Sequence, residues 1–446
     1  MNQMFSVSAT LGKSFGLLVL ASATLAFGGD WPQYRGANHD GICAEKILAT
    51  WTAPRLVWNA PTLGGFSCFS VGGGRAYTLV LGGDEEVCVA LDANTGKQVW
   101  SAPLGSAKFD GGGDSGAKEN KGGDGPRSTP TIDGDRVYVL SGYLVLFCFD
   151  AESGKEIWKK DLCQELGGKM IHWQNAASPV IDSDLIFVCS GGEERVAAAK
   201  NKSAEPKPEQ KNPVKGGVLA AINKKDGKVA WKGATETLTH ASPIVATILG
   251  VKQVIFFVKS GLVSVEPATG RELWRHAFPF KVSTAASPVV SGDIVYCSAG
   301  YGVGSSAAKI AKAGDKFTAT ELWRSEGNTI CNHWSTPVVK DGYLYGPFSF
   351  KQFGTGPIKC VEVATGKEMW SKDGFGPGGV VLVGNNFLAL SDTGELVLIE
   401  ASPKGFNQLG KFQAVQGKCW NTFAISNGRV YVRSTKEGAC LDVSSR

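Results

Sequence analysis

A short segment that ends in tryptophan recurs along the chain, and it constrains the fold more than any other feature of the sequence. Each copy consists of an apolar run, a polar turn that contains glycine, and a second short run that ends in Trp. Glycine adopts positive φ without the steric cost of a Cβ atom, so each copy predicts a β-hairpin. A repeat of this kind indicates a fold built from repeated units. The clearest copies are Ala90–Trp100, Cys148–Trp158, Ala221–Trp231, Val265–Trp274 and Val361–Trp370.

A second hairpin signal precedes most copies, in which Ser or Thr followed by Pro opens an apolar run, a turn and another apolar run. Proline suits the first residue of a strand, where its missing N–H need not pair. Two hairpins give a four-stranded antiparallel unit, and such a sheet cannot bury both apolar faces alone. We therefore expect the units to pack face to face around an axis. The Ser/Thr-Pro pairs are Thr129-Pro130, Ser178-Pro179, Ser242-Pro243, Ser287-Pro288 and Thr336-Pro337.

Eight tryptophans end successive units, which predicts eight blades; the fifth and seventh lack the Thr-Gly-Lys turn and are assigned by spacing. The chain stops before the last unit has an outer strand, and Arg55–Trp58 matches such a strand without a hairpin before it. The sequence thus predicts an all-β chain, an eight-bladed β-propeller of four-stranded antiparallel blades. It is closed by pairing of Arg55–Trp58 with Ala439–Val443, which hides the edge strands. The tryptophans are Trp58, Trp100, Trp158, Trp231, Trp274, Trp323, Trp370 and Trp420.

Composition agrees with this fold and excludes several classes of function. With 58 Gly and 12 Trp but 4 Met, the chain favours short strands joined by turns. The net charge of +5 includes a local surplus in residues 195–215, so no sustained basic face for nucleic acid is expected. The G-x-S-x-G pattern occurs only at Gly12–Gly16, within the first 28 residues, and no H-E-x-x-H or phosphate-loop motif is present. The 11 cysteines include no C-x-x-C pair, so they are either small buried hydrophobes or form one or two disulfides.

The first 28 residues have the pattern of a secretory signal peptide. Lys13 precedes the apolar run Phe15–Phe27, and these 13 residues are too few to cross about 30 Å of hydrocarbon as a helix. We expect a cleaved leader over 1–28, an N-terminal extension over 29–54 and the propeller over 55–446. Insertions at 105–125 and 193–217 are expected to be flexible. The expectation is an exported monomer, periplasmic or extracellular, without a membrane span.

In these repeats the chain resembles the family of eight-bladed propellers built from pyrroloquinoline-quinone (PQQ) type repeats. In that family each motif Trp packs against the turn of an adjacent blade, which implies this role for the eight tryptophans named above. The segment Asp30–Gly41 is similar to the start of exported PQQ-like members. The resemblance implies several kinds of function: quinoprotein alcohol or sugar dehydrogenase, propeller subunit of the outer-membrane β-barrel assembly machinery, or exported propeller without shown activity.

A PQQ enzyme needs cationic groups for the cofactor carboxylates, oxygen ligands for Ca²⁺ and a carboxylate base. The stretches where the innermost strands would begin contain no Asp or Glu, and the enzyme family's adjacent-cysteine ring is missing. We therefore expect no cofactor. In the alternative, Arg127 holds a PQQ carboxylate and loop acids hold Ca²⁺. These acids are Asp84, Glu85, Asp110, Asp114, Asp124 and Glu193.

Polar and aromatic residues gather just before the Ser/Thr-Pro starts and would surround one opening. They could form a ligand pocket, for an anion through Arg127, a carbohydrate through the tryptophans, or a metal ion through three histidines. Alternatively, they satisfy backbone groups and waters along a narrow channel. The leading hypothesis is a ligand-binding or protein-interaction scaffold for an unknown small molecule or envelope protein. The alternative is a PQQ- and Ca²⁺-dependent alcohol or sugar dehydrogenase. The residues are Arg127, His172, Trp173, Asn175, His240, Asn332, His333 and Trp334.

Overall fold

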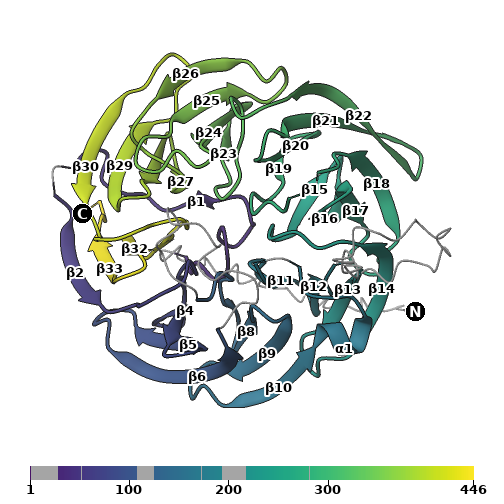
Figure 1. Ribbon diagram of the computed structural model, residues 1–446, viewed down its shortest axis with the longest axis horizontal. Coiled ribbons are helices and arrows are strands. Elements are labelled where there is room, and N and C mark those ends of the chain that lie inside the picture. Colours follow the sequence, from purple (N-terminus) through teal and green to yellow (C-terminus); the bar gives the residue numbers. More distant parts are fainter. Residues whose placement is uncertain are drawn as a thin grey trace, which may run out of the picture.

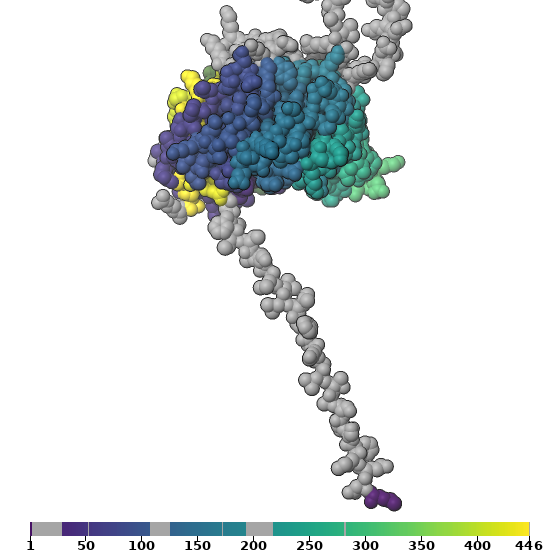
Figure 2. All heavy atoms as spheres, turned by 90° about the horizontal axis from the view of Figure 1, so that it is seen from below, coloured from purple at the N-terminus to yellow at the C-terminus, as the bar shows by residue number. Residues whose placement is uncertain are grey.

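The strands of the computed structural model form eight sheets around one central axis (Figure 1). The structure describes residue 1 and residues 29–51, 53–107, 125–171, 173–192, 217–280 and 282–445. Each blade is a four-stranded antiparallel sheet, so the predicted all-β, eight-bladed propeller is confirmed. Seen edge-on, the blades form a squat cylinder (Figure 2). The predicted leader and most of both predicted insertions lie outside the described residues.

The first four blades follow one another along the chain, each from its innermost to its outermost strand. Blade 1 is β3 (Ser70–Gly72), β4 (Arg75–Gly82), β5 (Glu85–Asp92) and β6 (Gln98–Ser106). Blade 2 is β7 (Thr131–Asp133), β8 (Arg136–Leu140), β9 (Val145–Asp150) and β10 (Glu156–Asp161). Blade 3 is β11 (Val180–Asp182), β12 (Leu185–Cys189), β13 (Gly217–Asn223) and β14 (Val229–Glu236). Blade 4 is β15 (Ile244–Ile248), β16 (Val251–Val258), β17 (Gly261–Val265) and β18 (Glu272–Ala277).

The last four blades complete the ring. Blade 5 is β19 (Val289–Ser291), β20 (Ile294–Ala299), β21 (Gly304–Ala313) and β22 (Lys316–Ser325). Blade 6 is β23 (Val338–Lys340), β24 (Tyr343–Pro347), β25 (Ile358–Glu362) and β26 (Glu368–Lys372). Blade 7 is β27 (Gly379–Val383), β28 (Asn386–Leu390), β29 (Glu395–Glu400) and β30 (Gln408–Gln413). Blade 8 is β31 (Ala424–Ser426), β32 (Arg429–Arg433), β33 (Gly438–Asp442) and β2 (Arg55–Ala60).

Two short elements lie outside this pattern. The strand β1 (Ile42–Cys43) runs parallel to β27 and adds a fifth strand to blade 7. The helix α1 (Leu162–Leu166) follows β10, and its N-cap residue Asp161 accepts the backbone N–H of Gln164 at 3.0 Å. No helix among the described residues is long and apolar enough to cross a membrane.

The ring closes where the sequence predicts. The strand β2 pairs with β33 in antiparallel register, from Arg55 opposite Asp442 to Ala60 opposite Gly438. An ion pair of 2.8 Å joins the side chains of Arg55 and Asp442. Figure 1 shows the purple N-terminal strand beside the yellow C-terminal one. The two chain ends therefore share a single blade, as the fold prediction requires.

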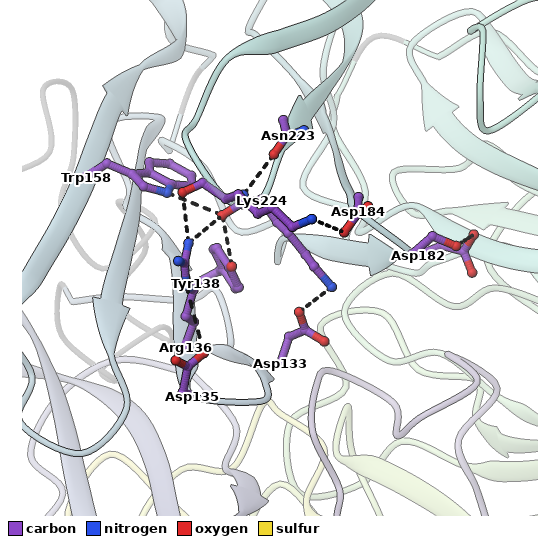
Figure 3. Close-up of polar contacts among 11 residues, drawn as sticks. Asp133, Asp135, Arg136, Tyr138, Trp158, Asp182, Asp184, Asn223 and Lys224 are labelled. Carbon is purple, nitrogen blue, oxygen red and sulfur yellow. Dashed lines mark hydrogen bonds and ion pairs between the residues drawn. The ribbon is translucent and has the colours of Figure 1, made fainter.

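Six tryptophans dock on the next blade as expected from the resemblance. In each, the indole Nε1–H donates to a backbone carbonyl oxygen in the turn of that blade, at 2.8–3.3 Å. Figure 3 shows one case, in which the Lys224 carbonyl accepts from Trp158 at 3.3 Å and from the Tyr138 hydroxyl at 2.9 Å. The six are Trp58, Trp100, Trp158, Trp231, Trp323 and Trp370.

Two tryptophans differ from this pattern. The indole of Trp274 donates to Gln253 Oε1 of its own blade at 2.6 Å, because blade 5 has the long β21–β22 hairpin in place of a short glycine turn. Trp420 is not on an outer strand at all, since it precedes β31. Its expected position on β30 is held by Gly410, against which Trp51 of the N-terminal extension packs.

The cysteines agree with the first of the two interpretations. All eleven are free, and ten of them are buried. Cys148, Cys360 and Cys440 occupy equivalent positions on third strands, each opposite a docking tryptophan. Burial raises the pKa of Cys440 to about 12, so its thiol stays protonated and packs as a small hydrophobic group.

Candidate ligand site at the channel mouth

A cavity of about 350 Å³ lies where the innermost strands of the blades begin. It is lined by residues from all eight blades and from the N-terminal extension. Its size falls within the range of small-molecule sites, which are concave and largely preformed. The side chains that give it its chemical character are Tyr34, Arg35, Phe66, Arg127, Trp173, His240, Tyr301, His333, Trp334, Lys351 and Trp420.

A ring of hydrogen bonds between blades fixes the shape of the mouth. The Ser/Thr-Pro residues make most of it: Thr129 N donates to Ser178 Oγ, and Ser178 N to Ser242 Oγ, both at 2.9 Å. These hydroxyls therefore join blades instead of facing a ligand. The other links are Cys68 N to Thr129 Oγ1, Ser287 Oγ to Ser242 O, Ser287 N to Thr336 Oγ1, Ser335 Oγ to Gly378 O, Thr422 Oγ1 to Val380 O and Asn421 Nδ2 to Ser67 O.

The N-terminal extension crosses the channel and lines part of the cavity. Its Arg35 guanidinium donates to the carbonyl oxygens of Thr336 and Pro337 at 3.0 and 3.1 Å, and to two carbonyls of its own segment, those of His39 and Asp40. Burial lowers the pKa of Arg35 from its ordinary value. Only 3% of Arg35 is exposed, so these carbonyl dipoles stabilise a cation that has almost no contact with water.

Aromatic rings form one wall of the cavity. Trp420 stacks on Phe66 with ring centroids 5.2 Å apart and on Trp334 at the same separation. Phe353 stacks on Trp420 at 4.7 Å, and the Lys418 ammonium lies 3.9 Å from the Trp420 ring centroid. Such stacking gives the cavity a rigid apolar surface.

The charged side chains of the described lining are all cations, and its polar side chains are hydroxyls, the Asn421 amide and imidazoles. Arg35, Arg127 and Lys351 line the cavity, and no Asp or Glu is among its described lining residues. The Gly300 N–H donates to His333 Nδ1 at 3.1 Å, so the neutral ring carries its proton on Nε2. Burial, with nearby His240 and Lys351, lowers the pKa of His333 to about 3. His333 is therefore a neutral donor across the physiological pH range.

Left-handed backbone conformations concentrate at this cavity. Arg35, Trp173, Tyr301 and Lys351 line it with φ between 57° and 66°. For residues other than glycine such a conformation costs about 1–3 kcal/mol and is typical of functional sites. The strain is thus an independent indication that the mouth is a site.

The structure brings five of the predicted mouth residues to the cavity and separates two others. Arg127, His240, His333 and Trp334 line it together with Trp173. Asn332 instead accepts the Tyr296 hydroxyl at 2.6 Å and donates to Pro347 O at 2.5 Å. Asn175 donates to Ala177 O at 2.9 Å and accepts the Ala177 N–H at 3.0 Å. Both amides satisfy backbone or buried polar groups, as the second sequence interpretation supposes.

The three-histidine metal site, one of the alternatives considered for the mouth, has no support among the described residues. His172, one of its three histidines, lies outside the described residues. Within the described part of the chain, no three His, Cys, Asp or Glu side chains are grouped so that they could hold a metal ion.

Sequence reasoning missed several lining residues. Tyr34 and Arg35 belong to the extension, Phe66 precedes β3, and Tyr301 and Lys351 lie in loops of blades 5 and 6. Trp420 carried a usable signal, because Trp420-Asn421-Thr422 stands just before β31, where blades 2 to 6 have Ser/Thr-Pro.

The described residues fit a flat organic anion better than a Ca²⁺-quinone pair. Arg127 and Lys351 can face carboxylates, and the aromatic wall can contact a flat ring. Asp84 and Glu85 lie at the β4–β5 turn and do not line the cavity. Asp110, Asp114, Asp124 and Glu193 are outside the described residues. The described lining thus provides no carboxylate ligand for Ca²⁺.

Comparisons with known proteins agree with the repeat pattern. Residues 83–346 match the family model described as outer membrane protein assembly factor BamB. The proteins of that name from Moranella endobia and Shewanella oneidensis are 24% and 23% identical to this chain over 284 and 259 residues. These matches span 62% and 55% of this chain and 64% and 56% of the relatives, less than two thirds of each. The crystal structure of quinohemoprotein alcohol dehydrogenase from Comamonas testosteroni superposes with a TM-score of 0.62 at 12% identity, covering 94% of this chain and 81% of that one, which shows the fold alone.

Proposed function

Since the chain belongs to the PQQ-repeat family described as outer membrane protein assembly factor BamB, we propose that it is an exported propeller that serves as a binding scaffold and whose channel mouth binds a small organic anion. The observation that carries this proposal is the cavity of about 350 Å³, whose described lining residues include cations, polar groups and aromatic rings but no Asp or Glu. Cations in such a partly dry cavity attract an anion more strongly than they would in bulk water.

The lining favours an anion over a neutral sugar, the other ligand class considered from the sequence. Sugar hydroxyls need acceptors, and carboxylates commonly provide them. Here the Ser/Thr hydroxyls Ser178, Ser242 and Thr336 are already bonded between blades. Arg127, Lys351 and the neutral His333 can only donate from the side that faces the cavity.

A binding titration tests the proposal. The probe is naphthalene-2,6-dicarboxylate, followed by tryptophan fluorescence and calorimetry, with the neutral dicarboxamide as a matched ligand. We expect saturable binding of the dicarboxylate that weakens as salt rises. Arg127→Gln and Lys351→Gln each remove a charged hydrogen-bond donor and should weaken it about tenfold. Lys404→Gln, at an exposed turn of blade 7, is the control and should leave the affinity unchanged.

Equal binding of the diacid and the diamide, or no saturable binding of either, would contradict the proposal. Turnover is the second arm, in which PQQ and Ca²⁺ are added and dye-linked oxidation of alcohols and sugars is followed. Turnover of any of these substrates would replace the scaffold function with that of a dehydrogenase.

Two features support export and an envelope partner as parts of the proposal. The segment 1–28 has the pattern of a secretory leader. The relatives are named as outer membrane protein assembly factors, so the proposal includes a protein of the bacterial envelope as a second kind of partner.

A further inference from the structure

A buried carboxylate of blade 7 holds the loop that brings Lys351 to the mouth. Asp392 lies between β28 and β29 and is 5% exposed. The Gly354 N–H lies 3.1 and 2.9 Å from its two carboxylate oxygens. Gly354 belongs to the segment 349–357, which joins β24 to β25 in blade 6 and is called the mouth loop below. A hydrogen bond to a charged acceptor is about twice as strong as a neutral one.

The end of the mouth loop, at Thr355 and Gly356, is held separately by backbone hydrogen bonds. Gly374 N donates to Thr355 O at 3.1 Å, and Phe375 N and Gly376 N both donate to Gly356 O at 2.9 Å. Gly376 also packs on the carboxyl group, because a Cβ atom added there would lie 2.3 Å from Asp392 Cγ. The Asp392 carboxylate is therefore enclosed by backbone of blades 6 and 7, and Gly354 is the point nearest to Lys351 at which it holds the loop.

The side of the mouth loop that faces the cavity carries the groups a ligand would meet. Lys351 is the described loop residue that lines the cavity, and its ammonium lies 5.0 Å from the Tyr301 ring centroid. Phe353 does not line the cavity, but it stacks on Trp420, which does. Lys351 has a φ of 57°, a conformation that persists only where surrounding contacts impose it. The hydrogen bond from the Gly354 N–H, three residues further on, to the Asp392 carboxylate is a contact of that kind.

Opposing effects act on the charged form of the Asp392 carboxyl group: burial disfavours it, and nearby donors favour it. Burial raises its pKa, while the Gly354 N–H and the Lys418 ammonium lower it. Burying a charge costs free energy unless hydrogen bonds and opposite charges offset the loss of water. The carboxylate does not itself line the cavity. It acts on the mouth through the Gly354 N–H of the loop and through the neighbouring Trp420 indole, which also lowers its pKa.

We propose that Asp392 is a positioning residue for the mouth: through Gly354 it sets the mouth loop so that Lys351 faces the bound anion. This inference rests on the proposed function. It predicts an effect opposite to simple electrostatics, because removing a negative charge near an anion site should by itself tighten binding. Loss of positioning should weaken it.

The test compares Asp392→Asn with Asp373→Asn, an exposed carboxylate next to Gly374 that undergoes the same charge change. Hydrogen exchange is measured over peptides that contain the mouth loop, and naphthalene-2,6-dicarboxylate is titrated into each protein. Asp392→Asn should exchange at least tenfold faster in the loop and bind about tenfold more weakly. Asp373→Asn should stay within twofold of the wild type, or bind slightly more tightly. Asp392→Ser replaces Asp392→Asn if the amide variant does not fold.

Unchanged exchange in Asp392→Asn would overturn the inference, whatever the binding result. Faster exchange with unchanged or tighter binding would also overturn it, since the loop would then be held for packing alone. If the wild type binds no dicarboxylate while the loop is released in the variant, the anchoring by Asp392 stands and the proposed anion function fails.

Discussion

Glu86 combines burial and charge at the edge of the site. It lies on β5 with 1% of its surface exposed, and it accepts the Gly142 N–H at 2.8 Å. Burial raises its pKa to about 7, although the Gly142 N–H and nearby Arg127 act in the opposite direction. Its charge state therefore changes within the range in which most proteins work.

Replacing Glu86 by Gln tests this pKa. Its folded pKa of about 7 lies above its ordinary 4.5, so the stability that Glu86 contributes is fully present below pH 4.5 and is lost as pH rises through 7. Gln has no proton to lose over this pH range, so the Glu86→Gln variant does not lose this stability. Relative to wild type, the variant should gain roughly 2–3 kcal/mol of unfolding free energy between pH 4.5 and 8.5. Urea unfolding at both pH values measures it, and a difference independent of pH would contradict the shifted pKa.

Residue type and position in the repeat identify only part of the mouth. Arg127 and His333 could be predicted because they immediately precede Ser/Thr-Pro starts, and these starts converge. Asn332 has the same position, but its amide bonds to Tyr296 and Pro347. The spacing of residues in the sequence does not show in which direction a side chain points. Lys351 could not be predicted, because Asp392 of another blade helps to hold its loop.

At the scale of the element, some blades share a three-donor contact that others lack. In Figure 3 the Lys224 carbonyl accepts from Arg136, Tyr138 and Trp158. The same arrangement joins Arg75, Tyr77 and Trp100 to the Ala151 carbonyl, and Arg429, Tyr431 and Trp58 to the Ala93 carbonyl. In blade 3 the equivalent side chains are Leu185 and Phe187, so only Trp231, of these three positions, reaches the Pro267 carbonyl.

This difference predicts unequal costs for the same substitution. Trp100→Phe removes one of three donors and leaves the Ala151 carbonyl bonded, so it should cost about 0.5–1.5 kcal/mol. Trp231→Phe deprives the half-buried Pro267 carbonyl of its indole donor and should cost about 1–3 kcal/mol, since an acceptor left without a donor there is more costly. Both indoles are similarly buried, at 8% and 9% exposure. Chemical denaturation measures the free energy of unfolding of both variants. Equal losses would show that the Arg75 and Tyr77 donors do not compensate for the lost Trp100 donor.

Strands were predicted well in the second blade because each hairpin has local signals of its own. The Thr129-Pro130 pair predicts the inner hairpin, which forms as β7 and β8, and the Cys148–Trp158 segment predicts the outer one, which forms as β9 and β10. The innermost strand β7 begins only at Thr131, because Thr129 bonds to the two neighbouring blades and not within its own sheet. In blade 7 a local signal was absent: Gly410 replaces the tryptophan and Trp51 covers it from outside the repeat.

At the scale of the whole molecule, the N-terminal extension ties distant blades together. Trp31 exchanges two backbone hydrogen bonds of 2.8 Å with Val71 of blade 1, and Ile132 of blade 2 donates to Pro32. Arg35 then reaches blade 6, β1 pairs with blade 7, and Leu48 donates to Val443 after blade 8. The repeats could not predict this path, because the extension has no counterpart in any other blade and its key cation is bonded only to backbone carbonyls.

Arg35→Ala tests whether the extension is part of the cooperative unit. The substitution leaves four carbonyls without their guanidinium donor, so the free energy of unfolding should fall by at least about 3 kcal/mol. Arg55→Ala is the control, because its exposed ion pair with Asp442 is worth about 0–1 kcal/mol. If the extension joins the blades into one unit, far-UV circular dichroism and tryptophan fluorescence should shift together to lower urea in Arg35→Ala. A merely appended segment would show faster hydrogen exchange over 31–43 with an unchanged midpoint, and the ring would then owe its closure to the β2–β33 pairing alone.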